Sequence, residues 1–198
     1  MYLKEEICGT TIIEKSRFIC YLKHVKSEEE YRTYLTSIRK KHHDATHVCS
    51  AFICGSIRRS SDDGEPSGTA GAPILNVLDK NGLDKTCALV VRYFGGIKLG
   101  AGGLIRAYGN AVSECLKQAT LVEDRIYPKY SLTLNYETAN KIDHFLKNST
   151  ILIDTIYDTD ITYIFALEDE KLMEKIKEFT RGIVPKKIGE ECVQKVVE

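Results

Sequence analysis

The sequence predicts an α+β protein with two domains, residues 1–120 and residues 121–198. Strand-like and helix-like patterns of apolar residues alternate along the chain, and 198 residues of which 43% are hydrophobic can fill two small cores. Charge also divides the chain, although its net charge is zero. The first 120 residues carry 17 Lys and Arg against 13 Asp and Glu, whereas the remaining residues carry 11 against 15. We therefore expect a polyanionic partner to bind the N-terminal domain.

The N-terminal domain is expected to begin with a β-hairpin and a helix. Residues 7–13 and 17–25 have the composition of two strands joined by a short turn. A capping box at Ser27 to Glu30 places acidic residues at the positive end of a helix, and apolar residues follow at helical spacing until three basic residues end the helix at 39–41. A third strand is predicted from Thr46 to Cys54.

The seven cysteines show no CxxC spacing and lie mostly among apolar neighbours, as expected for free thiols in a reducing cytosol. His47, Cys49 and Cys54 invite a zinc interpretation, but alternation along a strand places Cys54 on the face opposite the other two. Too few ligands remain, so we interpret them as core cysteines and a histidine at a strand start. The chain contains no membrane-length apolar window and begins without an apolar targeting stretch, which predicts a cytoplasmic protein with no membrane partner.

Residues 60–71 form an acidic loop, in which no regular element is expected because carboxylates, glycines and hydroxyls occur without an apolar period. Asp62, Asp63 and Glu65 have two interpretations. Hard cations such as Mg²⁺ bind several carboxylate oxygens, so these residues are candidate ligands of a divalent ion. Alternatively, they cap turns and pair with arginines, and an Asp before Gly favours this structural role. The candidate arginines are Arg58, Arg59 and Arg92.

A continuous apolar run at residues 87–91 predicts a strand covered on both faces, and a helix is expected from Ala101 to Ala119. Between them lies a glycine loop, residues 95–103, whose glycines allow positive φ and the close approach of a ligand. Its glycines are Gly95, Gly96, Gly100, Gly102 and Gly103.

Cationic groups are expected to converge on this glycine loop. The predicted strand carries Arg92 and Tyr93 to its carboxyl end, Lys98 lies in the loop, and Arg106 lies in the first turns of the helix. The free N–H groups of the helix N-terminus point to the same place. The sequence therefore predicts a pocket for an anion, in which Tyr93 can stack on a base.

The glycine loop does not match the nucleotide-binding fingerprints. Ala101 stands where the phosphate loop requires lysine, and Ile105 stands where the dinucleotide fingerprint requires its third glycine. We therefore expect no nucleotide cofactor. In the alternative interpretation, Gly100, Gly102 and Gly103 only permit close packing of the helix on the strand.

These elements predict a four-stranded sheet backed by two main helices in the N-terminal domain, with a short apolar segment at 72–78 whose Pro73 suits an early helical position. In the C-terminal domain the patterns follow the order βαββαβ, which is that of a ferredoxin-like sandwich. Its predicted elements are strands at 130–135, 150–157, 161–167 and 184–197, and helices at 137–147 and 168–182.

Two long blocks of this sequence, Ser61–Gly71 and Arg92–Tyr108, closely resemble the signature of the IMPACT family, whose bacterial members are often named YigZ. The resemblance is strongest over residues 1–120, and the remainder looks like the smaller C-terminal domain of bacterial members. It implies that the N-terminal domain has the fold of domain IV of elongation factor G, shared with the second domain of a small-subunit ribosomal protein. It likewise implies that the C-terminal domain is similar to domain V of elongation factor G.

Two functions follow as hypotheses. The first is a translation-linked regulatory protein without enzymatic activity, which binds RNA, the ribosome or a translation factor through the basic glycine-loop surface. The resemblance supports it, because eukaryotic relatives regulate translation initiation. The second is a metal-assisted phosphoryl or nucleotide hydrolase, in which Asp62, Asp63 and Glu65 hold the metal while Arg92 and Lys98 hold phosphate.

Overall fold

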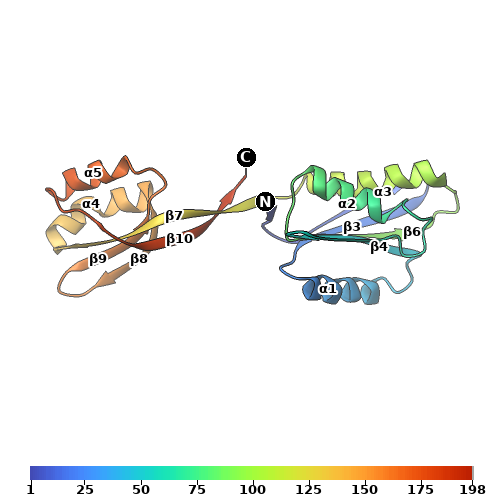
Figure 1. The fold of residues 1–198 in the computed structure, drawn as a ribbon, viewed down its shortest axis with the longest axis horizontal. Coiled ribbons are helices and arrows are strands. Elements are labelled where there is room, and N and C mark those ends of the chain that lie inside the picture. Colours follow the sequence, from blue (N-terminus) through green and yellow to red (C-terminus); the bar gives the residue numbers. More distant parts are fainter. Residues whose placement is uncertain (198) are drawn as a thin grey trace. The chain divides into compact units, whose positions relative to one another are not determined.

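The computed structural model describes residues 1–197, which divide into two compact units. The first unit comprises Met1–Glu123 together with Val196 and Val197, and the second comprises Asp124–Lys195. Figure 1 shows a sheet with helices in each unit. No helix within the described residues is long and apolar enough to cross a membrane.

The first unit is built on an antiparallel five-stranded sheet with the order β2-β3-β6-β4-β5. The prediction of a four-stranded sheet is therefore wrong, because the sheet has a fifth strand, β5, at its edge. The first two residues of the predicted acidic loop belong to this strand. Four of the five residues of β5 are exposed, so no buried apolar alternation marks this strand in the sequence. The strands are β2 (Ile7–Ile13), β3 (Ser16–His24), β4 (His47–Cys54), β5 (Ile57–Ser61) and β6 (Thr86–Tyr93).

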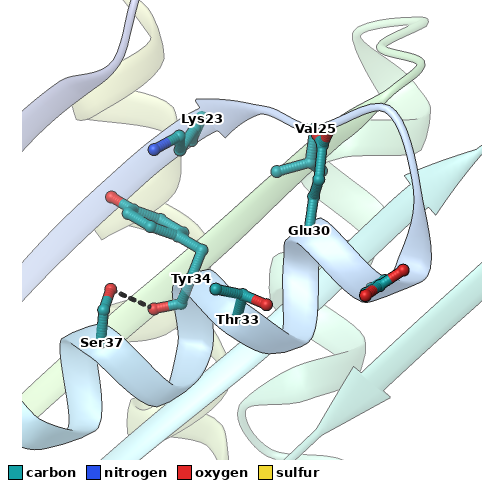
Figure 2. A pocket seen from close by; sticks show the side chains of 7 residues that line it. Lys23, Val25, Glu30, Thr33, Tyr34 and Ser37 are labelled. Atoms are coloured by element: carbon teal, nitrogen blue, oxygen red, sulfur yellow. Dashed lines mark hydrogen bonds between the residues drawn. The ribbon is translucent and has the colours of Figure 1, made fainter.

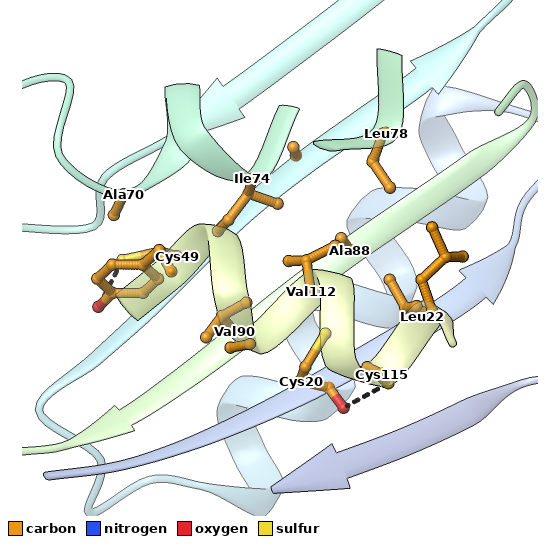
Figure 3. Close-up of a cluster of buried hydrophobic side chains, with 14 of the residues drawn as sticks. Cys20, Leu22, Cys49, Ala70, Ile74, Leu78, Ala88, Val90, Val112 and Cys115 are labelled. Atoms are coloured by element: carbon orange, nitrogen blue, oxygen red, sulfur yellow. Dashed lines mark hydrogen bonds between the residues drawn. The ribbon is translucent and has the colours of Figure 1, made fainter. Parts of the chain in front are cut away.

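Helices cover both faces of this sheet. The helix α1 (Glu28–Lys41) lies on one face, whereas α2 (Gly71–Lys80) and α3 (Gly100–Leu116) lie together on the other (Figure 1). The two main helices predicted are α1 and α3, which lie on opposite faces of the sheet, and the apolar segment predicted at 72–78 is the helix α2, with Pro73 in its first turn. Figure 3 shows the core between the sheet and the α2–α3 layer, where Ile74, Val90 and other apolar side chains interdigitate with cysteines. The continuous apolar run of β6 is buried on both faces, as predicted.

The predicted start of α1 is confirmed. The hydroxyl of Ser27 accepts a hydrogen bond from the backbone N–H of Glu30 at 3.2 Å. The carboxylate of Glu30 in turn accepts from the backbone N–H of Lys26 at 2.8 Å, one residue earlier than in a standard capping box. The free N–H groups of the first turn are thereby partly satisfied before the apolar face begins.

The second unit has the predicted element order βαββαβ, with strands in the order β8-β9-β7-β10. The strand β7 is longer than predicted and starts at Leu121. Its residues 121–123 belong to the first unit, where Leu121 and Val122 pair with the short strand β1 (Tyr2–Leu3). Three charged residues at 123–125 interrupt the apolar pattern there, which explains the late predicted start. The elements are β7 (Leu121–Leu134), α4 (Tyr136–Ser149), β8 (Ile151–Tyr157), β9 (Ile161–Ala166), α5 (Leu172–Phe179) and β10 (Lys186–Val196).

Candidate functional site

The carboxylate of Asp62 organises the acidic loop. It accepts hydrogen bonds from the backbone N–H groups of Gly68 at 2.8 Å, Ala70 at 3.0 Å and Gly71 at 2.8 Å. Gly71 is the first residue of α2, and Ala70 before it has no side chain that could cap the helix. Asp62, which is remote in the sequence, supplies this cap instead. The carboxylate of Asp62 is thus held by backbone donors between residues 68 and 71.

We expect Asp62→Ala to lower the free energy of unfolding by about 2 kcal/mol at pH 7, the upper end for a lost helix cap. Partial burial acts to raise the pKa of Asp62, and the three N–H donors outweigh it, so the pKa lies below its ordinary value. The stabilisation is therefore present above the unfolded pKa of about 3.9 and is lost as pH falls through the lower folded value. Urea unfolding at pH 7 and pH 3 checks both statements. Asp79→Ala, which removes only an exposed ion pair with Arg58, should cost less than about 0.5 kcal/mol.

Asp63 connects three elements. One carboxylate oxygen accepts from Arg39 of α1 at 2.6 Å, and the other accepts from the backbone N–H of Val48 in β4 at 2.7 Å. Its carbonyl oxygen accepts from Nδ1 of His47 at 2.8 Å. Asp63 adopts a φ of +43°, which an Asp in a turn tolerates better than most residues.

Glu65 forms a buried ion pair with Arg92. Oε1 of Glu65 accepts from Nη1 of Arg92 at 2.5 Å and from the hydroxyl of Tyr108 at 2.8 Å. The two charged side chains are 4% and 6% exposed, so the pair is almost fully buried. Burial and the neighbouring Cys49 and Glu65 raise the pKa of Tyr108, so its hydroxyl remains a donor.

The thiol of Cys49 lies beneath the same loop. It donates to the carbonyl of Asp62 at 3.0 Å and lies 3.3 Å from the hydroxyl of Tyr108. Burial raises the pKa of Cys49 to about 12. Since the thiolate is the reactive form of cysteine, this thiol is inert as a nucleophile at neutral pH.

The three carboxylates of the acidic loop thus face separate protein donors, which agrees with the structural interpretation. Within residues 1–197 no group of three His, Cys, Asp or Glu side chains is arranged to hold a metal ion. Of the candidate arginines, only Arg92 pairs with the loop. Arg58 pairs with Asp79, and Arg59 pairs with Glu28. The Mg²⁺ site remains a prediction that these contacts do not favour.

Arg92 and Tyr93 lie on opposite faces of the sheet, because successive side chains of β6 alternate. The hydroxyl of Tyr93 donates to Asp44 at 3.1 Å and lies 2.9 Å from Nδ1 of His42, while Arg17 covers its ring at 4.4 Å. Tyr93 therefore does not share a hollow with Arg92. The expectation that both face one pocket overlooked the alternation that the same strand assignment implies.

The glycine loop is shorter than predicted, because Gly100, Gly102 and Gly103 belong to the first turn of α3. Only Gly95 and Gly96 lie between β6 and the helix. The residue before α3, Leu99, offers no side chain to cap it, so the first N–H groups of α3 lack a side-chain acceptor.

Two hollows flank this helix start. The first, here called the loop hollow, has a volume of about 460 Å³ and lies between the start of β4, the acidic loop and α3. The second, the helix hollow, measures about 430 Å³ and lies between the β2–β3 turn and α3. Lys98 lines both; Arg92 lines the first and Arg106 the second. The predicted cations therefore surround one helix N-terminus without sharing a single pocket.

Lys98 and Arg106 are exposed and form no ion pair within the described range 1–197. The helix hollow also contains Glu14, at the β2–β3 turn. We call Lys98, Arg106 and the N-terminus of α3 the basic surface.

His47 is a site residue that the sequence interpretation missed. It pairs with Arg92 across β4 and β6, so both side chains lie on the same face. Nδ1 donates to the carbonyl of Asp63, and Nε2 lies 3.9 Å from Glu65 in the wall of the loop hollow. No spacing in the sequence reveals this; the register of the two strands creates it.

A further hollow lies on the opposite face, between β3 and α1 (Figure 2). Its cation, Lys23, pairs with Glu6 at 3.1 Å and covers the ring of Tyr34. The hydroxyl of Tyr34 donates to the same Glu6 carboxylate at 2.7 Å. With its cation neutralised and two glutamates at its rim, this hollow does not suit an anion.

Comparison with known proteins agrees with the two sequence blocks. Residues 14–116 match the family described as the Impact N-terminal domain. The chain belongs to the IMPACT family. IMPACT family member YvyE of Bacillus subtilis is 46% identical over 186 residues, which cover 90% of this chain and 86% of YvyE. IMPACT family member YigZ of Escherichia coli is 38% identical over 179 residues, covering 86% of this chain and 88% of YigZ.

A solved structure described as that of a hypothetical protein aligns with the whole chain and with 96% of its own, at 32% identity and a TM-score of 0.61. The α+β architecture is therefore shared with a solved protein of similar length. The more specific likeness to domains IV and V of elongation factor G stays a prediction.

Proposed function

We propose that this protein is a cytoplasmic, translation-linked regulatory protein that binds RNA, free or within the ribosome, through the basic surface. Family membership supports the link to translation. The resemblance described above implies that eukaryotic relatives regulate translation initiation. The observation that carries RNA binding is the position of Lys98 and Arg106, exposed and unpaired within the described residues, beside the uncapped N-terminus of α3. Phosphate is bound by this combination of cationic side chains and free N–H groups.

RNA is favoured over an acidic translation factor because apolar side chains alternate with the cations. Phe94, Ile97 and Ile105 are 47%, 39% and 45% exposed around the same helix start. Single-stranded nucleic acid offers both phosphates and flat rings, and proteins bind it with charged grooves that contain aromatic side chains. The contacts of the acidic loop do not favour the hydrolase hypothesis, because each carboxylate that it requires is held by protein donors.

A Lys98→Gln, Arg106→Gln variant should bind single-stranded RNA roughly thirtyfold more weakly, since each lost contact removes about 1 kcal/mol of charge attraction at the surface. The slope of log K against log salt should fall by about 1.4, at about 0.7 for each phosphate contact. Fluorescence anisotropy with a labelled RNA between 50 and 200 mM salt measures both quantities. Arg92 is left intact, because replacing it would damage the core.

The matched control is Lys40→Gln, Lys80→Gln, which removes two exposed charges from α1 and the end of α2. It should retain the affinity and the salt slope of the parent. Equal binding by the parent and the Lys98–Arg106 variant would exclude the basic surface as the RNA site. The parent could instead show no affinity for RNA but retain a translation factor from nuclease-treated lysate, while the Lys98–Arg106 variant does not. The partner would then be a protein and not RNA.

A further inference from the structure

The loop hollow is lined mainly by apolar groups, with a few polar groups among them. Pro66, Phe94 and Leu104 form part of its wall, whereas polar atoms come from Lys98, His47, the Glu65–Arg92 pair and the first turn of α3. A largely apolar hollow with a few polar groups that fix orientation is the usual form of a small-ligand site. Its volume of about 460 Å³ is within the range of such sites.

The cationic groups of the hollow favour an anion, because the Glu65 carboxylate that also lines it is already paired with Arg92. Gly100 and Ala101 of the uncapped α3 N-terminus line the hollow together with Lys98. A second observation comes from Arg92, whose side chain is 6% exposed and also lines the hollow. Its Nε has no hydrogen-bond partner within residues 1–197, although the guanidinium is otherwise held by Glu65 and Ser16. The wall of the hollow therefore keeps a buried cationic donor that the described protein atoms leave unsatisfied.

The apolar lining of the hollow favours a flat ring. Phe94 is 47% exposed, and its backbone N–H is fixed by the hydroxyl of Thr46 at 3.0 Å. The guanidinium of Arg92 lies over the Phe94 ring, 5.5 Å from its centre, and the exposed part of the residue is what a base would contact. Nε2 of His47 is not used by the hydrogen bond to Asp63 and offers a further polar atom to the base or the ribose.

We propose that the loop hollow binds one nucleotide of single-stranded RNA, with a phosphate at Lys98 and the N-terminus of α3 and the base against Phe94. The assignment rests on the proposed function and adds to it a base-binding pocket next to the basic surface. Lys98 lines both hollows, and Arg106 lies in the helix hollow beyond it. The phosphates of neighbouring nucleotides contact Arg106 there.

The test measures binding of octaadenylate RNA by fluorescence anisotropy for the parent, Phe94→Ala, Phe94→Tyr and Ala101→Leu. Phe94→Ala should weaken binding about tenfold or more, the range for loss of one base–aromatic stack, and Phe94→Tyr should restore it. The salt slope should remain that of the parent, because no charge is removed. Ala101→Leu fills the hollow from an exposed helical position and should weaken binding similarly without removing a contact.

Competition identifies the chemistry of the bound unit. Adenosine 5′-monophosphate should displace the RNA, and inorganic phosphate at the same concentration should displace less of it, because it lacks the ring. Equal displacement by both, or RNA binding within twofold of the parent for Phe94→Ala and Ala101→Leu, would overturn the pocket assignment while leaving the proposed function standing. Failure of the proposed function gives a different result, namely a parent protein that does not bind the RNA.

Discussion

Glu65→Ala will lower the free energy of unfolding by about 3–5 kcal/mol, the range for breaking a buried ion pair from one side. The substitution leaves the guanidinium of Arg92 buried without its carboxylate and removes the acceptor of the Tyr108 hydroxyl. Water cannot easily compensate, because the Arg92 side chain is 6% exposed. Urea unfolding at pH 7, followed by circular dichroism, measures the loss.

The control for this prediction removes both charges. Glu65→Leu, Arg92→Met replaces the pair by apolar groups and should recover most of the stability lost in Glu65→Ala, because the desolvation cost of the pair disappears with it. A loss below about 1 kcal/mol in the single variant would mean that solvent in the loop hollow already satisfies Arg92, and the pair would then not be a core interaction.

Gly95→Ala should prevent stable folding or cost more than the about 1–3 kcal/mol of ordinary overpacking. A Cβ at position 95 would lie 2.0 Å from the carbonyl carbon of Lys15 and 2.4 Å from the backbone nitrogen of Ser16. Both neighbours are backbone atoms of the β2–β3 turn, so no side-chain rotation relieves the clash. The measurement is the melting temperature, together with the yield of folded protein.

Two other glycines provide the controls for Gly95→Ala. Gly109 lies inside α3, where an added Cβ meets only Val77 at 4.0 Å, so Gly109→Ala should stabilise by about 0.5–1 kcal/mol. Gly96 has open space but a φ of +87°, so Gly96→Ala should cost only about 1 kcal/mol of backbone strain. If Gly95→Ala behaves like Gly96→Ala, the loop is not held against the hairpin as described.

The sequence predicts those elements whose signal is local. The cap at Ser27 and the apolar spacing behind it define α1, and the unbroken apolar run defines β6, because burial on both faces leaves no polar position. The strand β5 has no such signal. It pairs with β4 through its backbone at the sheet edge, and its exposed arginines and serines serve equally well in a loop.

The candidate site could be located from the sequence but not resolved into its contacts. The many glycines and charged residues identify the region. The Glu65–Arg92 pair could not be predicted, because its members are 27 residues apart and the sequence offers three arginines as partners of Glu65. Likewise, His47 reaches the loop hollow only because β4 and β6 pair in one register. Such contacts depend on tertiary packing, which no local pattern encodes.

The two ends of the described chain are both bound next to the start of β7. Leu3 pairs with Leu121, and the backbone N–H of Val197 donates to the carbonyl of the same residue at 2.9 Å. A fluorophore or fusion partner added at either end therefore begins in the same stretch of sheet, and the two ends can be joined by a short linker. A circularly permuted protein with new ends in the exposed Gly55 turn would retain every pairing described around Leu121.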